Sequence, residues 1–324
     1  MFMNIISNKA LNTKYQTGYG TANGTFGELL QGFLPNKKSF MVTLPINLFS
    51  YATFIPEVNT TNITVFPNHK IKSACLAKSL IRLFNIEVGG QLIIESELLE
   101  GKGLASSSAD LVATAYAISN TLKVSINEEL IARLIQPIEP SDGVMYSGIV
   151  SFYYKELKLI ESIGNLPGLV IIGIDEGGMI DTIEYNSKQK LYSQTDAIKY
   201  ENMLFSISKA IRNNDLGTVG KISTESTIMN QQYNPKQWVQ NLINICKDID
   251  GIGVSIAHSG TFAGILLDQN SINFTCQKLS CLEKIKKISH NISIFYSLDF
   301  STNNNIYDLP KYIERFNNVD TENG

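Results

Sequence analysis

Residues 100–110 read Glu100-Gly101-Lys102-Gly103-Leu104-Ala105-Ser106-Ser107-Ser108-Ala109-Asp110, a run of glycine and small side chains that enters an alanine-rich segment. Residues 109–118 are apolar on nearly every side, which predicts a buried helix. Small residues let the backbone approach a ligand closely, and the first turn of a helix adds unpaired N–H groups and a positive dipole end. The stretch therefore predicts a phosphate site, at which a serine hydroxyl could also reach Mg²⁺.

This loop differs from two common phosphate-binding motifs. A Walker A sequence needs a glycine separated by four residues from Gly-Lys, and Ser96 takes that place. A GxGxxG fingerprint fails because Ser106 stands where the third glycine belongs. An alternative without any ligand also stays open, in which a serine is simply the N-cap of a core helix.

The composition narrows the class of protein. The 324 residues include 44% hydrophobic and 18% charged residues, which is typical of a globular chain and excludes a long disordered one. A net charge of −3 gives no basic excess, so we expect no nucleic-acid partner. No apolar run reaches the roughly 20 residues of a membrane span, so we expect no membrane partner.

The N-terminus and the cysteines point to the compartment. Residues 1–16 have neither a charged start nor a sustained apolar core, so we expect no secretory signal and a cytoplasmic protein. With four scattered cysteines, no CxxC pair and three histidines, we expect neither a zinc site nor a disulfide scaffold.

Strands and helices alternate without the regular rhythm of a doubly wound parallel sheet, which predicts an α+β fold. The expected strands are residues 40–44, 49–55, 63–66, 91–95, 148–154, 169–174, 253–257, 264–267 and 292–296. The expected helices are residues 70–84, 109–118, 127–135, 197–212, 216–229, 237–247 and 272–288. The length suggests two domains, and a boundary near Pro167 divides the chain into 1–165 and 166–324.

Residues 103–108 resemble the second motif of the GHMP small-molecule kinases, a family named for galactokinase and the homoserine, mevalonate and phosphomevalonate kinases. That motif reads approximately Pro-x-x-x-Gly-Leu-Gly-Ser-Ser-Ala. In this chain Ala105 replaces a glycine and the upstream proline is missing. An alanine costs little at that position if its φ is negative, and it strains the loop if its φ is positive.

Two further segments resemble the other motifs of this family. Residues 20–32 (GTANGTFGELLQG) resemble the first motif, which ends in Gly-Glu, and residues 253–261 (GVSIAHSGT) resemble the third, where most members have a run of glycines. Together with the Glu-Pro-Ser-Asp segment at 139–142, they look like the L-threonine kinases within the family. The resemblance covers about residues 17–268.

This resemblance implies a fold, two cofactors and a partner. The fold would have an N-terminal domain like domain 2 of ribosomal protein S5 and a ferredoxin-like C-terminal domain. ATP and Mg²⁺ would be the cofactors, and a small hydroxy amino acid, with L-threonine as the first guess, would be the partner. Both a monomer and a homodimer are compatible with the sequence.

The resemblance assigns the loop to the ATP phosphates, through Lys102, Gly103, Leu104, Ala105, Ser106, Ser107 and Ser108. Ser107 would also hold Mg²⁺, and Glu139 would complete the metal site. Lys102 would neutralise phosphate charge, with a solvent-exposed lysine as the alternative. The alternative for Glu139 is a surface glutamate at the end of a helix.

Asp142 is the candidate catalytic base, because the resemblance places an aspartate there opposite the acceptor hydroxyl. The alternative is a turn aspartate, since Pro-Ser-Asp-Gly is a strong β-turn sequence. A role in positioning the hydroxyl also remains open.

The candidate acceptor site takes residues from the first and third motifs: Glu28, Gln31, His258, Ser259, Gly260 and Thr261. Glu28 could pair with an ammonium group, while backbone N–H groups near 258–261 could receive a carboxylate or a phosphate. The alternatives are an edge-strand charge for Glu28, a buried and satisfied histidine for His258, and hairpin closure for Ser259 and Thr261.

Three other functions compete with a threonine kinase. One is a kinase for another hydroxylated amino acid in specialised biosynthesis, and another is a catalytically silent member that binds a nucleotide or metabolite. A serine hydrolase is disfavoured, because no GxSxG elbow surrounds Ser106, Ser107 or Ser108.

Overall fold

The computed structural model describes residues 15–178 and 193–300, so most of the N-terminal segment read for a secretory signal lies outside the described residues. The strands are β1 Gly18–Phe33, β2 Ser39–Glu57, β3 Ile63–Phe66, β4 Gly89–Ser96, β5 Ile149–Tyr153, β6 Lys158–Gly164, β7 Leu169–Asp175, β8 Gly253–Ile256, β9 Phe262–Asp268 and β10 Ile292–Tyr296. The helices are α1 Ile71–Leu83, α2 Ser106–Leu122, α3 Glu128–Ile135, α5 Gln194–Arg212, α6 Leu216–Asn230, α7 Val239–Asp248 and α8 Phe274–Lys286.

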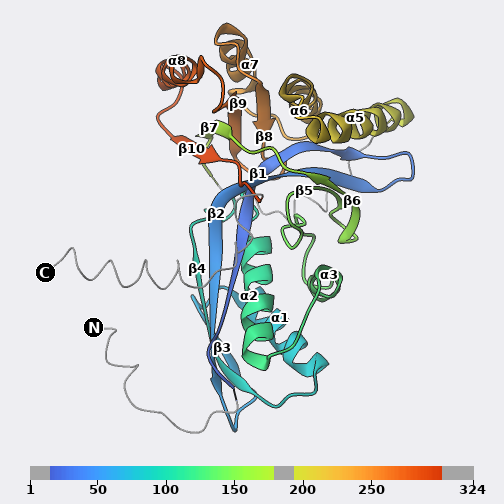
Figure 1. The fold of residues 1–324 in the computed structure, drawn as a ribbon, viewed down its shortest axis with the longest axis vertical. Coiled ribbons are helices and arrows are strands. Elements are labelled where there is room, and N and C mark those ends of the chain that lie inside the picture. Colours follow the sequence, from blue (N-terminus) through green and yellow to red (C-terminus); the bar gives the residue numbers. More distant parts are fainter. Residues whose placement is uncertain (1–14, 179–192, 301–324) are drawn as a thin grey trace, which may run out of the picture.

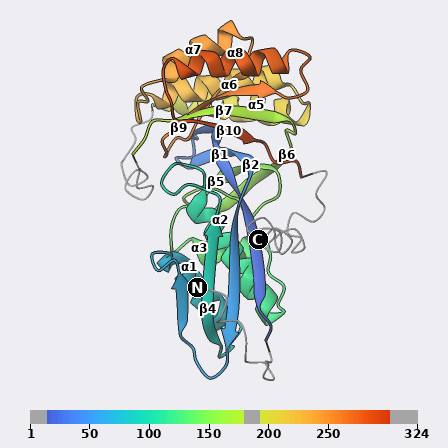
Figure 2. The same cartoon turned by 90° about the vertical axis from the view of Figure 1, so that its left-hand side faces the viewer.

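All strands belong to one curled sheet, in which the main path runs β10-β7-β9-β8-β1-β2-β4-β3 and β5 joins β2 to β6. The long hairpin of β1 and β2 forms the spine of the molecule (Figure 1). Helices α1, α2 and α3 lie at one end of this spine, and α5 to α8 lie at the other (Figures 1 and 2). The predicted α+β class is confirmed.

Helix α2 packs closely on the hairpin because β1 offers glycines beneath it. A Cβ atom on Gly20 would lie 2.0 Å from the carbonyl oxygen of Ala113, and one on Gly18 would lie 2.1 Å from that of Ala117. The helix is buried on nearly every side, as the alanine-rich sequence predicts, and it begins three residues earlier than expected, at Ser106. The N-terminal end of α2 is thereby held against the middle of β1.

Three differences from the expected elements lie in the sheet. Strand β1 was not among the expected strands, because its sequence is rich in glycine and small residues. The segments 40–44 and 49–55 are parts of the single 19-residue strand β2. Pro45 does not break this strand, because it lies opposite Thr25 where the register of β1 and β2 shifts, and a proline is tolerated at such an irregularity. Strand β6 was not expected, since its sequence KLIESIG mixes charged and apolar residues.

The sheet crosses from one end of the molecule to the other at β1. Glu28 pairs with Thr43 of β2 and with Ile256 of β8, and the register of β1 against β2 shifts on both sides of Glu28. Apolar side chains form a large core cluster and a smaller one between the sheet end and α7 and α8. The predicted boundary between residues 165 and 166 lies between β6 and β7 and remains a prediction. Within 15–178 and 193–300, no helix is long and apolar enough to cross a membrane.

Candidate active site

The loop before α2 turns its carbonyl groups toward the protein. The carbonyl oxygens of Lys102, Gly103 and Leu104 accept hydrogen bonds from the N–H groups of Thr261, Gly27 and Thr25, at 3.1, 3.1 and 3.2 Å. Three successive carbonyls therefore bond the scaffold. Because carbonyl oxygens repel anions, this arrangement favours an anion on the other side of the loop.

The backbone of this loop is left-handed at three places, with φ of 68° at Gly101, 82° at Gly103 and 59° at Ala105. A Cβ on Gly103 would lie 2.4 Å from Cβ of Ala257, so only glycine fits there. Ala105 has the positive φ that a glycine accepts freely, and the loop is strained there by about 1 kcal/mol or more. The strained alternative for this alanine, left open by the sequence, is the correct one.

Helix α2 begins without a side-chain cap. Its N-cap residue is Ala105, and the helix has no side-chain cap hydrogen bond, so the interpretation of a serine N-cap is wrong. The first helical bond joins the Ala109 N–H to the Ala105 carbonyl, which leaves the N–H groups of Ser106, Ser107 and Ser108 ahead of the helical ladder. Ser106 Oγ is also buried and has no hydrogen-bond partner among the described residues.

Ser107 meets Glu139 at the start of α2. The Ser107 hydroxyl donates to Glu139 Oε1, and Lys72 of α1 forms an ion pair with Glu139 Oε2. Glu139 follows α3, where its N–H bonds the Ile135 carbonyl, and it is 8% exposed. It is therefore a buried carboxylate, and the alternative of a surface glutamate is wrong.

Ser108 meets Asp142 one residue further along the helix. The Ser108 hydroxyl donates to Asp142 Oδ2 at 3.0 Å, and Asp142 N–H donates back to Ser108 Oγ at 3.2 Å. Removal from water, with the nearby charges of Glu28 and Glu139, raises the pKa of Asp142 to about 7. The hydrogen-bonded turn in this segment is closed by the Tyr146 N–H on the Gly143 carbonyl. Asp142 therefore comes directly before the turn and is not one of its residues.

Glu28 lies inside the sheet, and the interpretation of an edge-strand charge is wrong. It is 4% exposed and pairs on both sides, with β2 and β8. Its Oε2 accepts from His258 Nδ1 at 2.8 Å and from His258 N–H at 3.1 Å. His258 is 1% exposed and satisfied, as its alternative interpretation predicts.

Lys102 and Thr261 meet at Asp175 behind the loop. Lys102 Nζ lies 2.7 Å from Asp175 Oδ2, and Thr261 Oγ1 donates to Asp175 Oδ1 at 2.6 Å. Although burial opposes it, these hydrogen bonds hold the pKa of Asp175 below its usual range. The Lys102 side chain is 16% exposed, so it is not the freely solvated lysine of the alternative interpretation.

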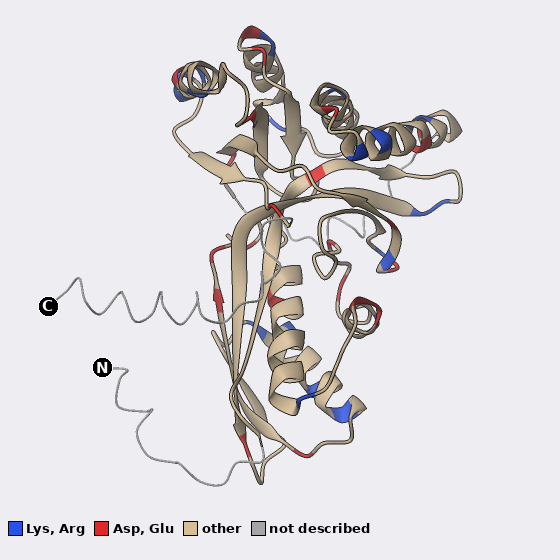
Figure 3. Ribbon diagram, in the orientation of Figure 1, with Lys and Arg blue, Asp and Glu red and all other residues tan. Residues whose placement is uncertain are grey.

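Most of the predicted residues enclose one small cavity, about 50 Å³ in volume. Its lining consists of Glu28, Leu99, Gly103, Leu104, Ala105, Ser106, Ser107, Ser108, Glu139, Pro140, Asp142 and Ser259. This volume suits a group of about the size of a phosphoryl group. The cavity lies between the loop, the start of α2 and the carboxylates of Glu28, Glu139 and Asp142. α2 itself carries one charged residue, Asp110 (Figure 3).

Five predicted residues do not line the cavity: Lys102, Gln31, His258, Gly260 and Thr261. His258 does not face the cavity but is hydrogen-bonded to Glu28, which does. Residues 259–261 form a turn that packs against the loop, where the Thr261 N–H bonds the Lys102 carbonyl. The Gln31 side chain lies at Tyr154, with which it forms a hydrogen bond, and its Oε1 is buried without a hydrogen-bond partner among the described residues.

Sequence reasoning missed several charged groups around the cavity. Lys72 carries no signal beyond its place on an amphipathic helix. Lys236, between α6 and α7, is 7% exposed, and its ammonium group donates to the Gly260 carbonyl. Burial lowers the pKa of Lys236 to about 8. A lysine in a polar connection gives no sequence signal of burial.

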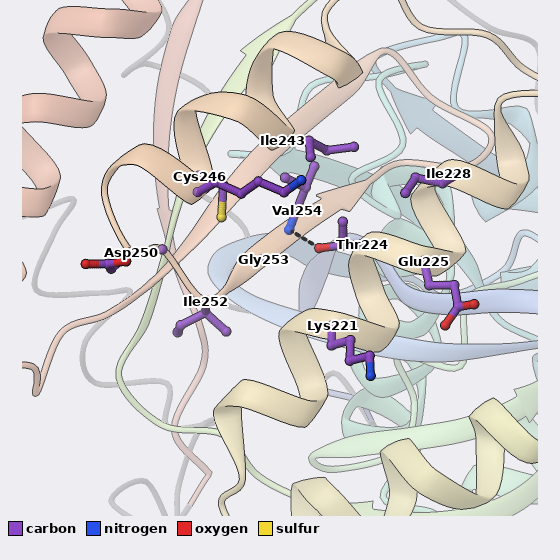
Figure 4. Close-up of a pocket in the computed structure, with 12 residues that line it drawn as sticks. Lys221, Thr224, Glu225, Ile228, Ile243, Cys246, Asp250, Ile252, Gly253 and Val254 are labelled. Carbon is purple, nitrogen blue, oxygen red and sulfur yellow. Dashed lines mark hydrogen bonds between the residues drawn. The ribbon is translucent and has the colours of Figure 1, made fainter.

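A larger groove lies away from this cavity, between α6 and α7 (Figure 4). It holds about 610 Å³, and its lining includes Lys221, Thr224, Cys246 and Asp250. The Thr224 hydroxyl is already engaged there, since it donates to the Gly220 carbonyl and accepts from the Val254 N–H. No predicted site residue lines this groove, so we do not take its larger volume as a sign of the active site.

In the part of the chain that the structure describes, no cluster of three or more His, Cys, Asp or Glu side chains could hold a metal ion by itself. The oxygen atoms of Ser107 and Glu139 are adjacent, however, and such a pair suits Mg²⁺ when phosphate oxygens supply the remaining ligands. The unpaired Ser106 hydroxyl and the open helix start fit a phosphate beside it.

Comparisons with known proteins find similar sequences and a similar fold among small-molecule kinases. Residues 71–154 match the family model of the GHMP kinases N terminal domain. An L-threonine kinase of Citrobacter freundii is 23% identical over 249 residues, which is 75% of this chain and 84% of the relative. An L-threonine kinase of Salmonella typhimurium is 24% identical over 268 residues, 80% of this chain and 85% of the relative. The crystal structure of a homoserine kinase from Cytophaga hutchinsonii superimposes with a TM-score of 0.67 at 15% identity, covering 90% of this chain and 97% of that one.

Proposed function

We propose that this chain, which belongs to the GHMP kinases and is an ATP-dependent small-molecule kinase, phosphorylates the side-chain hydroxyl of a small amino acid, with L-threonine as the first candidate. The implied GHMP kinase fold is confirmed by the solved structures that it resembles. The observation that carries the proposal is the meeting of two serine–carboxylate pairs, Ser107–Glu139 and Ser108–Asp142, at the open start of α2.

The phosphates of ATP would bind at the loop and the α2 start. The N–H groups of Ser106, Ser107 and Ser108 precede the helical ladder, and a helix dipole favours an anion there. Ser107 and Glu139 would hold Mg²⁺, which neutralises phosphate charge when bound. In this structure the ammonium group of Lys72 balances the charge of Glu139, and Mg²⁺ would take its place beside that carboxylate.

Asp142 would accept the proton of the acceptor hydroxyl. A base works best when its pKa lies near the working pH, and a pKa of about 7 meets that condition. Its hydrogen bonds with Ser108 fix one carboxylate oxygen and the backbone, which orients the group before the acceptor arrives.

An amino-acid acceptor suits the remaining charge of the cavity. Glu28 is a third carboxylate in the lining, and it is not needed for the metal or for proton transfer. A carboxylate in a small cavity favours a cationic group, and the α-ammonium group of an amino acid is such a group. The relatives named L-threonine kinase support threonine among the possible acceptors.

An ADP-release assay across acceptors tests this function. The panel contains L-threonine, L-serine, L-homoserine, D-threonine and 3-hydroxybutyrate, each with and without Mg²⁺, and phosphorus NMR identifies the product. We expect Mg²⁺-dependent turnover of L-threonine and a phosphomonoester on its hydroxyl. Faster turnover of another amino acid would reassign the acceptor. ATP binding without turnover of any acceptor would support the catalytically silent alternative.

A further inference from the structure

Glu28 is held in a fixed orientation by groups behind the cavity wall. Two donors, His258 Nδ1 and the His258 N–H, both bond Oε2 of its carboxylate. The register of β1 shifts on either side of Glu28, and Gly27 has a φ of 49°, so the backbone turns this side chain toward the cavity. Oε1 is therefore the oxygen left for a ligand.

His258 is oriented in turn from its other side. Its Nε2 lies 3.1 Å from Ser226 Oγ, on α6, and its carbonyl accepts from Asn234 Nδ2 at 2.9 Å. Since a carboxylate can only accept, Nδ1 carries the proton that bonds Glu28. A neutral ring then accepts at Nε2, and the Ser226 hydroxyl donates to it.

Ser226 is placed by the backbone of β1. Its Oγ accepts from the Gln31 N–H at 3.3 Å, which leaves the hydroxyl hydrogen for His258. The order serine, histidine, carboxylate is that of a hydrolase triad, but Ser226 is 0% exposed and has no room for a substrate. The chain of hydrogen bonds therefore ends at Glu28 and not at a nucleophile.

We propose that Ser226 and His258 are positioning residues, which hold Glu28 through Oε2 so that Oε1 receives the α-ammonium group of the acceptor. This inference rests on the proposed function and assigns to it a specificity for acceptors that carry a primary ammonium group. A carboxylate with one oxygen fixed presents a single directed acceptor, which costs less ordering on binding than a free side chain.

Steady-state kinetics of matched variants tests the positioning role. We expect Ser226→Ala and His258→Ala to raise KM for L-threonine about tenfold or more, with KM for ATP within about twofold of the wild-type value. His258→Asn keeps an N–H donor at the position of Nδ1 and should recover most of the loss. Glu28→Gln keeps the size of the side chain and removes its negative charge, so it should raise KM for L-threonine more than KM for ATP.

Ser223→Ala is the matched control. Ser223 is a buried serine one turn earlier on α6, and its hydroxyl donates to the Val254 carbonyl at 3.0 Å and not to His258. It should leave both KM values near wild type, and thermal unfolding monitors the folding of each variant. Equal changes in the two KM values, no recovery in His258→Asn, or an effect of Ser223→Ala as large as that of Ser226→Ala would overturn the positioning role.

Failure of the proposed function gives a different result. A folded wild-type protein that turns over no amino acid would overturn the function and the ammonium site together. An active wild-type protein with unaffected variants would overturn the positioning role alone.

Discussion

Helices α5 and α2 begin in opposite ways. Ser193 caps α5 by accepting from the Asp196 N–H at 3.0 Å, and the Asp196 side chain accepts from the Ser193 N–H, so side chains satisfy two of the N–H groups at the start of α5. Helix α2 begins at Ser106 after the N-cap residue Ala105 and has no side-chain cap, although its first three residues are serines. Their hydroxyls serve other purposes: two bond carboxylates, and the third is buried without a described partner.

The difference shows how a function is built at the expense of local stability. Helices α1, α7 and α8 also lack a side-chain cap, but water reaches their first turns at Ile71, Gln240 and Thr275. At α2 the first turn has Ser106 and Ser108 buried on either side of the exposed Ser107, and the N–H groups of these three serines precede the helical ladder. Unpaired donors beside a cavity are costly without a ligand, which supports an anion as their partner.

Replacing Asp142 is expected to have the largest effect on activity. Asp142→Asn keeps an acceptor for the Ser108 hydroxyl and removes the base, so kcat should fall about 10²- to 10⁴-fold. ADP release with L-threonine measures this. A change of less than threefold would show that Asp142 is not the base.

The same substitution should stabilise the protein at pH 8. The folded pKa of Asp142 is raised from 3.8 to about 7, so the ionised carboxylate destabilises the fold above pH 7, and this cost is absent below about pH 4. Asp142→Asn should therefore raise the unfolding temperature by about 2 °C or more at pH 8 and less toward pH 4. A lower unfolding temperature at pH 8 would contradict the raised pKa.

Activity should follow the ionisation of Asp142. We expect kcat/KM to fall about tenfold per unit as pH drops below about 7, because the base is then protonated. The negative charge of Glu28 contributes to the raised pKa, so Glu28→Gln should move this limb to lower pH. The pH–rate profiles of the wild-type protein and of Glu28→Gln test this effect. An acidic limb at the same pH in both would show that Glu28 does not raise the pKa of Asp142.

Two serine substitutions compare the two helix starts directly. Ser107→Ala removes the proposed Mg²⁺ ligand and should lower kcat/KM for MgATP about 10- to 100-fold, with little loss of stability. Ser193→Ala removes the cap of α5 and should lower the free energy of unfolding by about 1 kcal/mol without changing the kinetics. Urea unfolding and steady-state assays separate the two, and similar profiles for both variants would remove the distinction.

The smallest effect is expected at Ala105. Ala105→Gly relieves the left-handed backbone and should stabilise the protein by about 1 kcal/mol, as measured by urea unfolding. KM for ATP should change by less than about threefold, because the loop keeps its shape. A destabilised variant would show that the positive φ of this residue carries little strain.

Local patterns account for most of what the sequence predicted. The helical period of residues 70–84 and the buried alanine run of α2 were readable because their periodicity depends only on nearby residues. The one long strand β2 was read as two, since no local signal shows that Pro45 lies at a register shift whose partner is 20 residues away on β1.

The site was predictable in its motifs and not in its pairing. Ser107, Glu139 and Asp142 were selected through resemblance, and the sequence alone left a cap, a surface charge and a turn as alternatives. The contacts that decide between these interpretations span more than 30 residues, as in Ser107–Glu139 and Ser108–Asp142. The Ser226–His258–Glu28 chain joins residues up to 230 apart, which no spacing rule could find.

Hydrogen exchange at the two helix starts tests most directly whether the open N-terminus of α2 binds a triphosphate. The amides of residues 103–108 are compared with those of residues 194–197, in the presence and absence of Mg²⁺ and a non-hydrolysable ATP analogue. Slower exchange confined to 103–108 is the predicted result. Unchanged exchange there, or protection only around the groove between α6 and α7, would contradict the account.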